Sequence, residues 1–176
     1  MSSNRREKVF LKISFFITLL SIIFVVFVLT NHLSKLSIKN ITAEKPQKVK
    51  ITRVIDGDTI VTENNEKIRL IGIDAPEKSQ HNPEKCLSDR ATQKAKDLLE
   101  GQYVDLEKDV SDTDKYGRLL RYIWLNNQLI NNTLVEEGYA KASFYNPDIK
   151  YKLSLESSEI IAQQRKLGVW GNVCSD

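Results

Sequence analysis

The sequence predicts an α+β fold in which a five-stranded β-barrel with three helices follows an N-terminal transmembrane helix. Three observations lead to this prediction. Short segments with an apolar residue at every second position recur between turn signals, as in strands with one buried face. Segments with the helical spacing of apolar residues lie between and after these strands. Near the N-terminus, residues 13–30 contain no charged residue and no proline.

The uncharged segment is long enough to cross a membrane. As a helix it would span about 27 Å, close to the thickness of a hydrocarbon core. The basic flank 1–12 fits either a cleaved signal peptide or an uncleaved anchor with its N-terminus in the cytoplasm. We favour the anchor, because the segment exceeds the roughly 7–15 apolar residues of a signal peptide. Residues 31–47 are polar and are interpreted as a linker to a domain at 48–176.

The domain begins with three successive strands. Apolar residues alternate from Lys48 onward, and further strands are expected at Thr59–Glu63 and Lys67–Ile73. Asp-Gly and Asn-Asn pairs supply the two turns between them. The third strand is apolar on both faces apart from Arg69. We therefore expect this guanidinium to lie in a pocket, where it would bind an anion.

One helix and two strands follow. Ser88 is expected to cap a helix whose body, Ala91–Glu100, ends at Gly101. The next strands are expected at about Tyr103–Glu107 and Gly117–Leu125, on either side of a charged loop. A helix between the third and fourth of five strands matches a Greek-key barrel of the oligonucleotide-binding (OB) type.

Two helices complete the domain. They are expected at about Asn131–Glu137, closed by Gly138, and at about Asp148–Lys166. Their position after the barrel predicts that they pack against it. Residues of the longer helix that share one apolar face are Leu153, Ile160, Ile161 and Leu167.

Charge excludes a broad basic surface that binds nucleic acid nonspecifically. The net charge of the chain is +3, but residues 45–176 contain 20 Lys and Arg against 21 Asp and Glu. The surplus of positive charge therefore belongs to the N-terminal segment. A phosphate ligand of the domain would be bound by a few placed cations.

Cys86 and Cys174 are the chain's two cysteines. They form no CxxC motif, and too few histidines lie nearby for a zinc site. A disulfide is the simplest interpretation, and it would indicate an oxidising location outside the cytoplasm. Two unrelated buried thiols are the alternative.

Acidic residues occur in two tight turns. Asp56 and Asp58 lie in the first, and Asp74 and Glu77 lie in the second. We expect the two turns to meet at one end of the barrel. Clustered carboxylates favour a hard divalent cation, with coordination places left for water and phosphate. Aspartate also favours turns for structural reasons alone, and it is the nearby Arg69 that favours a site.

A second cationic segment is Asp114-Lys115-Tyr116-Gly117-Arg118. It brings an arginine, a lysine and a phenol to the start of the fifth strand. A solvated loop would have a similar composition. The spacing of acidic residues begins like an EF-hand, but Ile123 stands where that motif has glutamate, and we reject this interpretation.

The strings IDGDT, RLIGIDAPE and DKYGR, followed by VEEGYAK and LGVW, occur in this order over about residues 47–173. They resemble the thermonuclease family typified by staphylococcal nuclease. The resemblance implies a Ca²⁺-dependent nuclease on the OB barrel that cuts DNA and RNA and leaves 3′-phosphate ends. It also implies that Asp58, Asp74 and the backbone carbonyl of Ala75 bind Ca²⁺, with Asp56 in a supporting role.

Other residues receive roles from the same resemblance. Glu77 corresponds to the general base for water, and Arg69 and Arg118 correspond to the arginines that bind the phosphate. Lys115 and Tyr116 correspond to contacts with the terminal phosphate of the nucleotide. The spacing after the short helix departs from the family by one residue, so that either Phe144 or Tyr145 could stack on the base. The loop that carries Cys86 resembles that of the disulfide-bearing bacterial members of the family.

The sequence therefore predicts a hydrolase of phosphodiester bonds, anchored in the cell membrane by residues 13–30 with its domain outside, or secreted if this segment is cleaved. DNA and RNA are the expected substrates, Ca²⁺ the expected cofactor and a monomer the expected state. The alternative is an inactive OB module that binds nucleic acid or a protein. It is disfavoured because the acidic residues and both arginines are present. A surface protein stiffened by calcium and a disulfide has no specific sequence feature in its favour.

Overall fold

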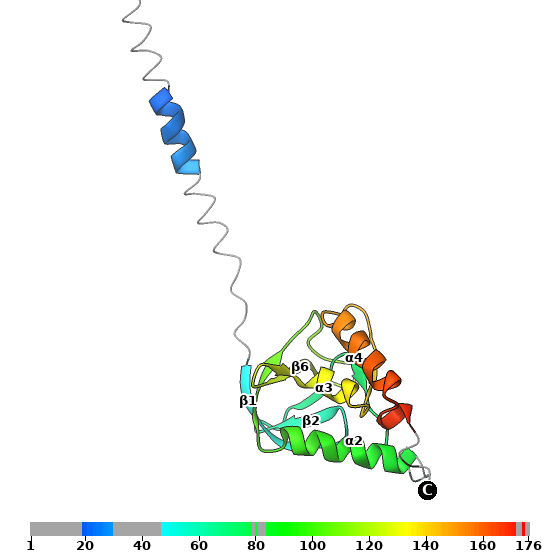
Figure 1. Cartoon of the computed structure of the whole chain (residues 1–176). Coiled ribbons are helices and arrows are strands. Elements are labelled where there is room, and N and C mark those ends of the chain that lie inside the picture. The colour runs from blue at the N-terminus through cyan, green and yellow to red at the C-terminus, as the bar shows by residue number, and fades with distance from the viewer. Residues whose placement is uncertain (1–18, 30–46, 79, 81–83, 172–173, 175–176) are drawn as a thin grey trace, which may run out of the picture. The chain divides into compact units, whose positions relative to one another are not determined.

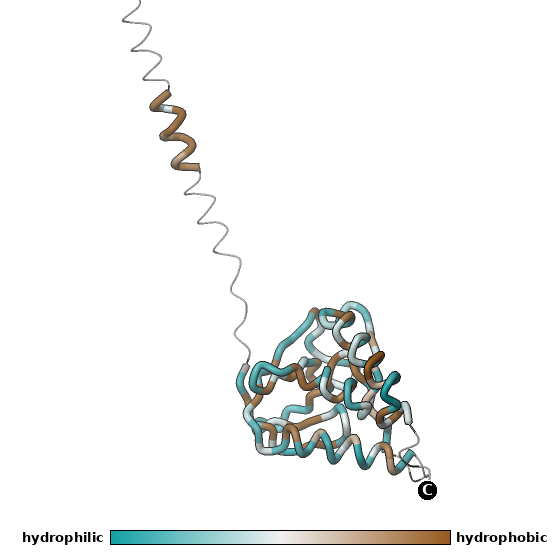
Figure 2. Tube along the Cα trace, in the orientation of Figure 1, coloured by the Kyte–Doolittle hydropathy of each residue, from teal (hydrophilic) through white to brown (hydrophobic). Residues whose placement is uncertain are grey.

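The computed structural model describes residues 19–29, 47–78, 80, 84–171 and 174. Contacts within the chain divide it into two units, Met1–Lys45 and Pro46–Asp176. In the first unit, residues 19–29 are helical, and their side chains are exposed and almost all apolar (Figure 2). None of the helices in the described ranges is both long and apolar enough to cross a membrane. The rest of the predicted segment 13–30, the flank 1–12 and the linker up to residue 46 lie outside the described residues.

The second unit contains a closed barrel of five strands (Figure 1). Neighbouring strands follow the order β3-β2-β1-β5-β6, and β3 pairs in parallel with β6 to close the ring. All other barrel pairs are antiparallel. The predicted five-stranded barrel is thus confirmed. Its strands are β1 (Gln47–Val54), β2 (Thr59–Thr62), β3 (Lys67–Leu70), β5 (Tyr103–Glu107) and β6 (Leu119–Leu125).

Three short strands add to this barrel. β7 (Gln128–Leu129) extends the sheet beside β6, and β4 (Ile73–Asp74) pairs with β8 (Lys141–Ala142). The predicted strand Lys67–Ile73 is therefore too long. Gly72 interrupts it with φ +78°, and a Cβ at this position would lie 2.5 Å from Leu155. Glycine suits this turn because its positive φ would strain another residue, and because the side chain of Leu155 leaves no space for a Cβ.

Helix α2 (Glu84–Leu99) connects β4 to β5 and contacts β1. It starts earlier than predicted, and Ser88 is not its cap. The Ser88 hydroxyl is buried and donates to the carbonyl of Lys85 within the helix. An acidic residue in the first turn, Glu84, suits the helix start electrostatically.

Two more helices, α3 (Ile130–Glu136) and α4 (Lys152–Gln164), pack against each other and are followed by the short helix η1 (Gly168–Trp170). The predicted apolar face of α4 is wrong, because Leu153 is 81% exposed and Ile160 is 53% exposed. The packed face contains Leu155 and two small residues, which allow α3 and α4 to approach closely. A hydropathy pattern does not recognise such a face when one of the small residues is a serine.

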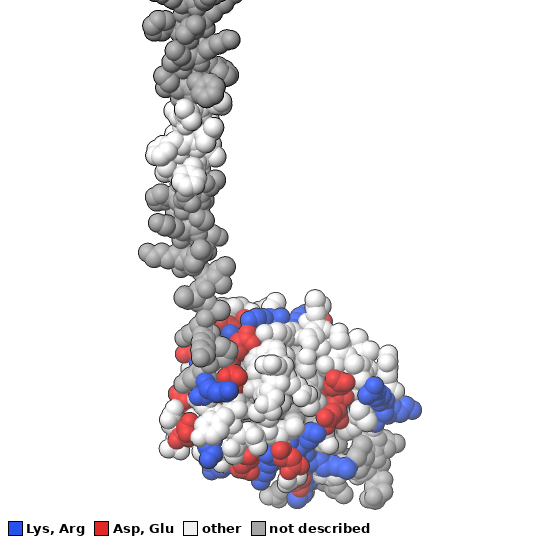
Figure 3. Space-filling view, turned by 60° about the vertical axis from the view of Figure 1, so that its left-hand side comes forward, with Lys and Arg blue, Asp and Glu red and all other residues white. Residues whose placement is uncertain are grey.

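The barrel interior is filled by aliphatic side chains such as Ile51, Ile60 and Ile68, each with no exposed surface. Figure 2 shows the hydrophobic residues concentrated inside this unit. In β3, buried residues alternate with more exposed ones, whereas all four residues of β2 are buried. On the face shown in Figure 3, Lys, Arg, Asp and Glu are interspersed. This mixture agrees with the nearly neutral charge of the domain.

A disulfide joins Cys86 in α2 to Cys174 near the C-terminus, with 6.0 Å between the two Cα atoms. The predicted pairing is confirmed. The bond closes a loop over 88 positions of the sequence, so that it restricts the unfolded chain strongly.

Candidate active site

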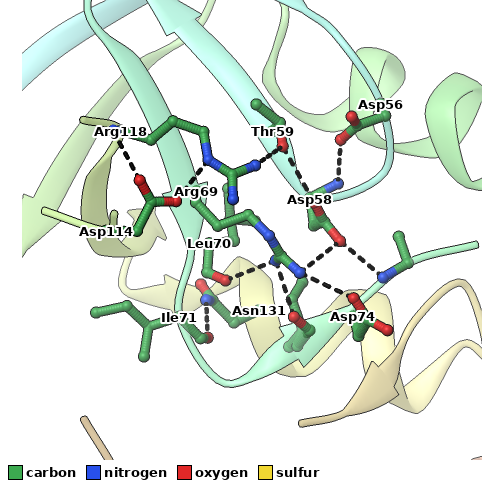
Figure 4. A network of polar contacts seen from close by, with 12 residues as sticks. Asp56, Asp58, Thr59, Arg69, Leu70, Ile71, Asp74, Asp114, Arg118 and Asn131 are labelled. Atoms are coloured by element: carbon green, nitrogen blue, oxygen red, sulfur yellow. Dashed lines mark hydrogen bonds and ion pairs between the residues drawn. The ribbon is translucent and has the colours of Figure 1, made fainter. Parts of the chain in front are cut away.

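Two acidic side chains converge on one guanidinium at an end of the barrel (Figure 4). Nη2 of Arg69 lies 3.1 Å from Oδ2 of Asp58 and 2.9 Å from Oδ1 of Asp74. Nη1 of the same side chain donates to the carbonyls of Leu70, at 3.0 Å, and Ile73, at 2.8 Å. The guanidinium is thus held from both sides, and its orientation is fixed by the corner between β3 and β4.

Strand register and one glycine bring these residues together. Thr59 pairs with Arg69 across β2 and β3, which places Asp58 beside the arginine. Gly57 lies against the second acidic turn, since a Cβ there would be 2.5 Å from the Cβ of Ala75 and 2.9 Å from that of Ala91. A side chain at position 57 would therefore separate the two turns.

Asp58 is buried, with 6% of its surface exposed. Burial raises its pKa to about 6, although the charge of Arg69 and a hydrogen bond from the Ala75 amide lower it, and the charge of Asp56 adds to the increase. The Ala75 amide donates to Oδ2 of Asp58 at 2.7 Å. Asp56 lies at the same turn and accepts a hydrogen bond from the Asp58 amide at 3.2 Å. Additional positive charge at this place would stabilise the ionised form of Asp58.

Arg118 is oriented by Asp114. Its Nε donates to Oδ2 of Asp114 at 2.7 Å, while the amides of Tyr116 and Arg118 donate to Oδ1 at 2.9 and 3.0 Å. Burial would raise the pKa of Asp114, but these three hydrogen bonds outweigh it and the pKa is lowered. A terminal nitrogen of Arg118 lies 3.5 Å from the hydroxyl of Thr59, which in turn donates to Asp58 at 3.1 Å. The second arginine is therefore linked to the acidic pair (Figure 4).

A cavity of about 510 Å³ opens beside the two arginines. Tyr116 and Tyr145, which are 73% and 77% exposed, stand at this cavity. The ammonium of Lys115 lies 5.0 Å from the ring centre of Tyr116. Exposed rings beside cations suit a nucleotide, which offers both a flat base and a phosphate. The lining includes Arg69, Gly72, Ile73, Lys115, Tyr116, Arg118, Ser143, Tyr145 and Asp148.

Most of the predicted site residues lie in this region, and Glu77 and Ala75 stand at its acidic turn. Glu77 is exposed, and the contacts that join Asp58, Asp74 and Arg69 do not include it. Ala75 presents its amide, not its carbonyl, to Asp58. The roles of all these residues stay predictions.

The acidic pair fits part of the ligand shell of a hard cation. Carboxylates of Asp58 and Asp74 both contact the same nitrogen of Arg69, so their oxygens lie close enough to each other to share a cation beside it. Oxygen ligands of this type match Ca²⁺, which binds six to eight of them. Among the described residues, no group of three or more His, Cys, Asp or Glu side chains is arranged to hold a metal ion. A cation here would therefore complete its shell with backbone, water or phosphate oxygens.

Sequence reasoning missed several residues that position the site. Asp148 is buried and accepts hydrogen bonds from the amides of Val110, at 3.0 Å, and Ser111, at 2.7 Å. Asn131 is also buried; it donates to the carbonyl of Ile71 at 2.8 Å and accepts from the amide of Ile123 at 3.0 Å. Both connect segments far apart in the sequence. By contrast, the orienting role of Asp114 could be predicted from the local sequence, because aspartate at the start of a turn often accepts hydrogen bonds from the amides that follow it.

The strand order and the parallel closure of the ring define a barrel of the OB class, with an acidic pair, two oriented arginines and an aromatic cavity at its site. Residues 67–172 match the family model described as staphylococcal nuclease homologue. The chain belongs to this family.

Individual relatives agree with this assignment. The chain is 40% identical over 130 residues to a thermonuclease of Staphylococcus hyicus, which covers 72% of this chain and 77% of that protein. It is 39% identical over 136 residues to a thermonuclease of Staphylococcus intermedius, with 75% and 81% covered. Endonuclease YncB of Bacillus subtilis is 35% identical over 135 residues, with 72% of this chain and 63% of that protein covered.

Proposed function

We propose that this chain, a nuclease by its family and its relatives, requires Ca²⁺ and hydrolyses the phosphodiester bonds of both DNA and RNA to leave 3′-phosphate ends. The observation that carries the proposal is the convergence of Asp58 and Asp74 on Arg69, with Arg118 linked to them through Thr59. An acidic pair with two adjacent arginines can hold a cation and a phosphate at the same place.

The two arginines have complementary surroundings. Arg69 is fixed by two carboxylates and two carbonyls, so it neutralises charge at one defined position. Arg118 uses Nε for Asp114, and one of its terminal nitrogens makes a long 3.5 Å contact with the Thr59 hydroxyl beside Asp58 (Figure 4). A guanidinium held in this way can donate two hydrogen bonds to phosphate oxygens and stabilise the charge that develops on phosphorus.

The acidic residues would hold the cation and handle protons. Asp58 and Asp74 are the proposed Ca²⁺ ligands, together with the carbonyl of Ala75 and with Asp56 in support. When bound, Ca²⁺ would supply a Lewis acid that polarises the phosphate and orients a water molecule. Glu77 is solvent-exposed, and we assign it the role of accepting a proton from the attacking water.

Lys115, Tyr116 and Tyr145 would bind the nucleotide. Their positions at the cavity beside both arginines allow a base to stack on a ring while a phosphate contacts the lysine. Stacking depends little on base identity. This arrangement supports action on both DNA and RNA.

The test is hydrolysis by the purified chain. Single-stranded DNA, double-stranded DNA and RNA are incubated with Ca²⁺, with Mg²⁺ or with a chelator, and the product ends are identified by treatment with a 3′-phosphatase. We expect cleavage of DNA and RNA with Ca²⁺ and phosphatase-sensitive 3′ ends. Products that carry 5′-phosphates, or cleavage restricted to one type of nucleic acid, would contradict the proposal.

We also propose that residues 13–30 hold the protein in the cell membrane as a monomer with its domain outside, or direct its secretion if the segment is cleaved. The uncharged segment and the disulfide support this location. Cell fractionation with protease treatment of intact cells tests it. Intact protein in the cytosolic fraction would contradict both forms of the proposal.

A further inference from the structure

We propose that Lys141, with the ring of Trp170 beneath it, forms a second phosphate-binding site for the neighbouring phosphate of a single-stranded polynucleotide. This site would lie next to Asp74, away from the aromatic cavity. The inference rests on the proposed function and extends it from one phosphate to a bound strand.

Strand pairing places Lys141 beside the acidic pair. β8 and β4 are antiparallel, and Lys141 is the partner of Asp74 in their register. Side chains at paired positions point to the same face of a sheet, with Cβ atoms about 5 Å apart. Lys141 is exposed, and the Asp74 side chain is 58% exposed. A phosphate held at Arg69 would therefore have the Lys141 ammonium as its next cation along this edge.

The lysine is supported by an aromatic ring. Its ammonium lies 5.1 Å from the ring centre of Trp170 in η1. The chain before this ring is fixed against the turn before β8, because the Val169 amide donates to the carbonyl of Gly138 at 2.9 Å. A Cβ on Gly138 would lie 2.4 Å from the carbonyl oxygen of Leu167, which shows how closely the two segments pack. Lys141 and Trp170 are thus held together by backbone contacts.

A polynucleotide substrate continues on both sides of the cleaved bond, so it can be bound on both sides. The aromatic cavity is lined by Arg69 but not by Asp74 or Lys141. A strand that fills this cavity and presents a phosphate to Arg69 continues past Asp74 to the edge formed by β4 and β8. Lys141 is the partner of Asp74 at this edge, and its ammonium would bind the next phosphate of the strand. A lysine is a point charge that binds phosphate without reading the base.

The experiment compares two substrates with the purified chain and Ca²⁺. Thymidylyl-thymidine (dTpdT) has one phosphodiester and no neighbouring phosphate, whereas octathymidylate has neighbours at most of its bonds. The readout is the ratio of KM for dTpdT to KM for octathymidylate, which measures the benefit from neighbouring phosphates. We expect Lys141→Gln to lower this ratio by about three- to tenfold. The slope of log(kcat/KM) for octathymidylate against log salt should become shallower by about 0.7.

Two further variants separate binding from a structural role. Lys141→Arg keeps the charge and should restore most of the ratio. Lys50→Gln is the matched control, because Lys50 likewise stands on a β-strand, in its case β1, with its ammonium 5.9 Å from the ring centre of Tyr103. Its ratio should equal that of the wild type. An equal loss on both substrates, or the same loss in Lys50→Gln, would overturn the inference. Wild type that cleaves neither substrate would instead overturn the proposed function, and the second site with it.

Discussion

Replacement of Arg118 by lysine tests whether the guanidinium fork is needed. In the structure, Nε of Arg118 donates to Asp114 at 2.7 Å, and a terminal nitrogen reaches the Thr59 hydroxyl beside the acidic pair at 3.5 Å. Lysine has a single nitrogen whose three donors share one position, so it cannot keep the contact with Asp114 and also offer a planar pair of donors to two phosphate oxygens. Loss of one preorganised donor to a transition state lowers kcat by about 100- to 1,000-fold, or about 3–4 kcal/mol. We expect a decrease of this size for Arg118→Lys.

The fold should be retained in this variant. The Arg118 side chain is 28% exposed, and a partly exposed ion pair contributes at most about 1 kcal/mol. The assay is kcat and KM on octathymidylate with saturating Ca²⁺, together with urea unfolding. Arg121→Lys is the matched control, since Arg121 lies in β6, three residues after Arg118, and also has an aspartate partner, Asp112, at 2.7 Å. Near-normal kcat in Arg118→Lys, or an equal decrease in Arg121→Lys, would refute the reasoning.

Three further predictions concern one residue beside the site and two interactions that stabilise the fold. Asp148→Ala leaves two amides of the loop before Asp114 without their acceptor. KM should rise more than kcat falls, and the free energy of unfolding should decrease by about 1–3 kcal/mol. An unchanged KM would show that this loop does not position the nucleotide. Burial would raise the pKa of Glu107, but hydrogen bonds from Lys150, Trp124 and Tyr151 outweigh burial and lower this pKa below its ordinary value of 4.5. Ionised Glu107 therefore stabilises the fold above about pH 4.5, and this contribution is lost as the pH falls through the lowered pKa. Glu107→Gln should reduce the loss of stability between about pH 5 and 3 in urea titrations, and parallel wild-type and variant curves would disprove this. Joint replacement of Cys86 and Cys174 by serine should lower the free energy of unfolding by up to about 4–5 kcal/mol, as measured by urea unfolding, and an unchanged midpoint would contradict a stabilising disulfide.

The acidic turns and the barrel could be predicted from the sequence because their determinants are local. The alternation of apolar residues sets each strand, and adjacent antiparallel strands must bring Asp58 near Arg69 once the turn between them is short. Asp74 follows Arg69 after only one further corner. The convergence of these residues is therefore a consequence of neighbouring segments.

The remaining features depend on contacts between distant segments. The break of the third predicted strand at Gly72 arises because Leu155 packs there and Asn131 binds the carbonyl of Ile71, and no local pattern contains this information. The buried role of Asp148 likewise depends on a loop 37 positions earlier. The roles of the acidic residues and arginines follow from the resemblance to a family, and the structure adds the partners that orient their side chains.

The dependence of the cleavage rate on Ca²⁺ in wild type and in Asp74→Asn tests the central claim most directly. The amide keeps the shape of the side chain but removes one of the two negative charges that face Arg69. We predict that chelated wild type is inactive, that Ca²⁺ restores its rate, and that Asp74→Asn needs at least tenfold more Ca²⁺ for half of its maximal rate. Full activity of the chelated wild type, or an unchanged Ca²⁺ requirement in Asp74→Asn, would contradict a calcium site formed by the acidic turns.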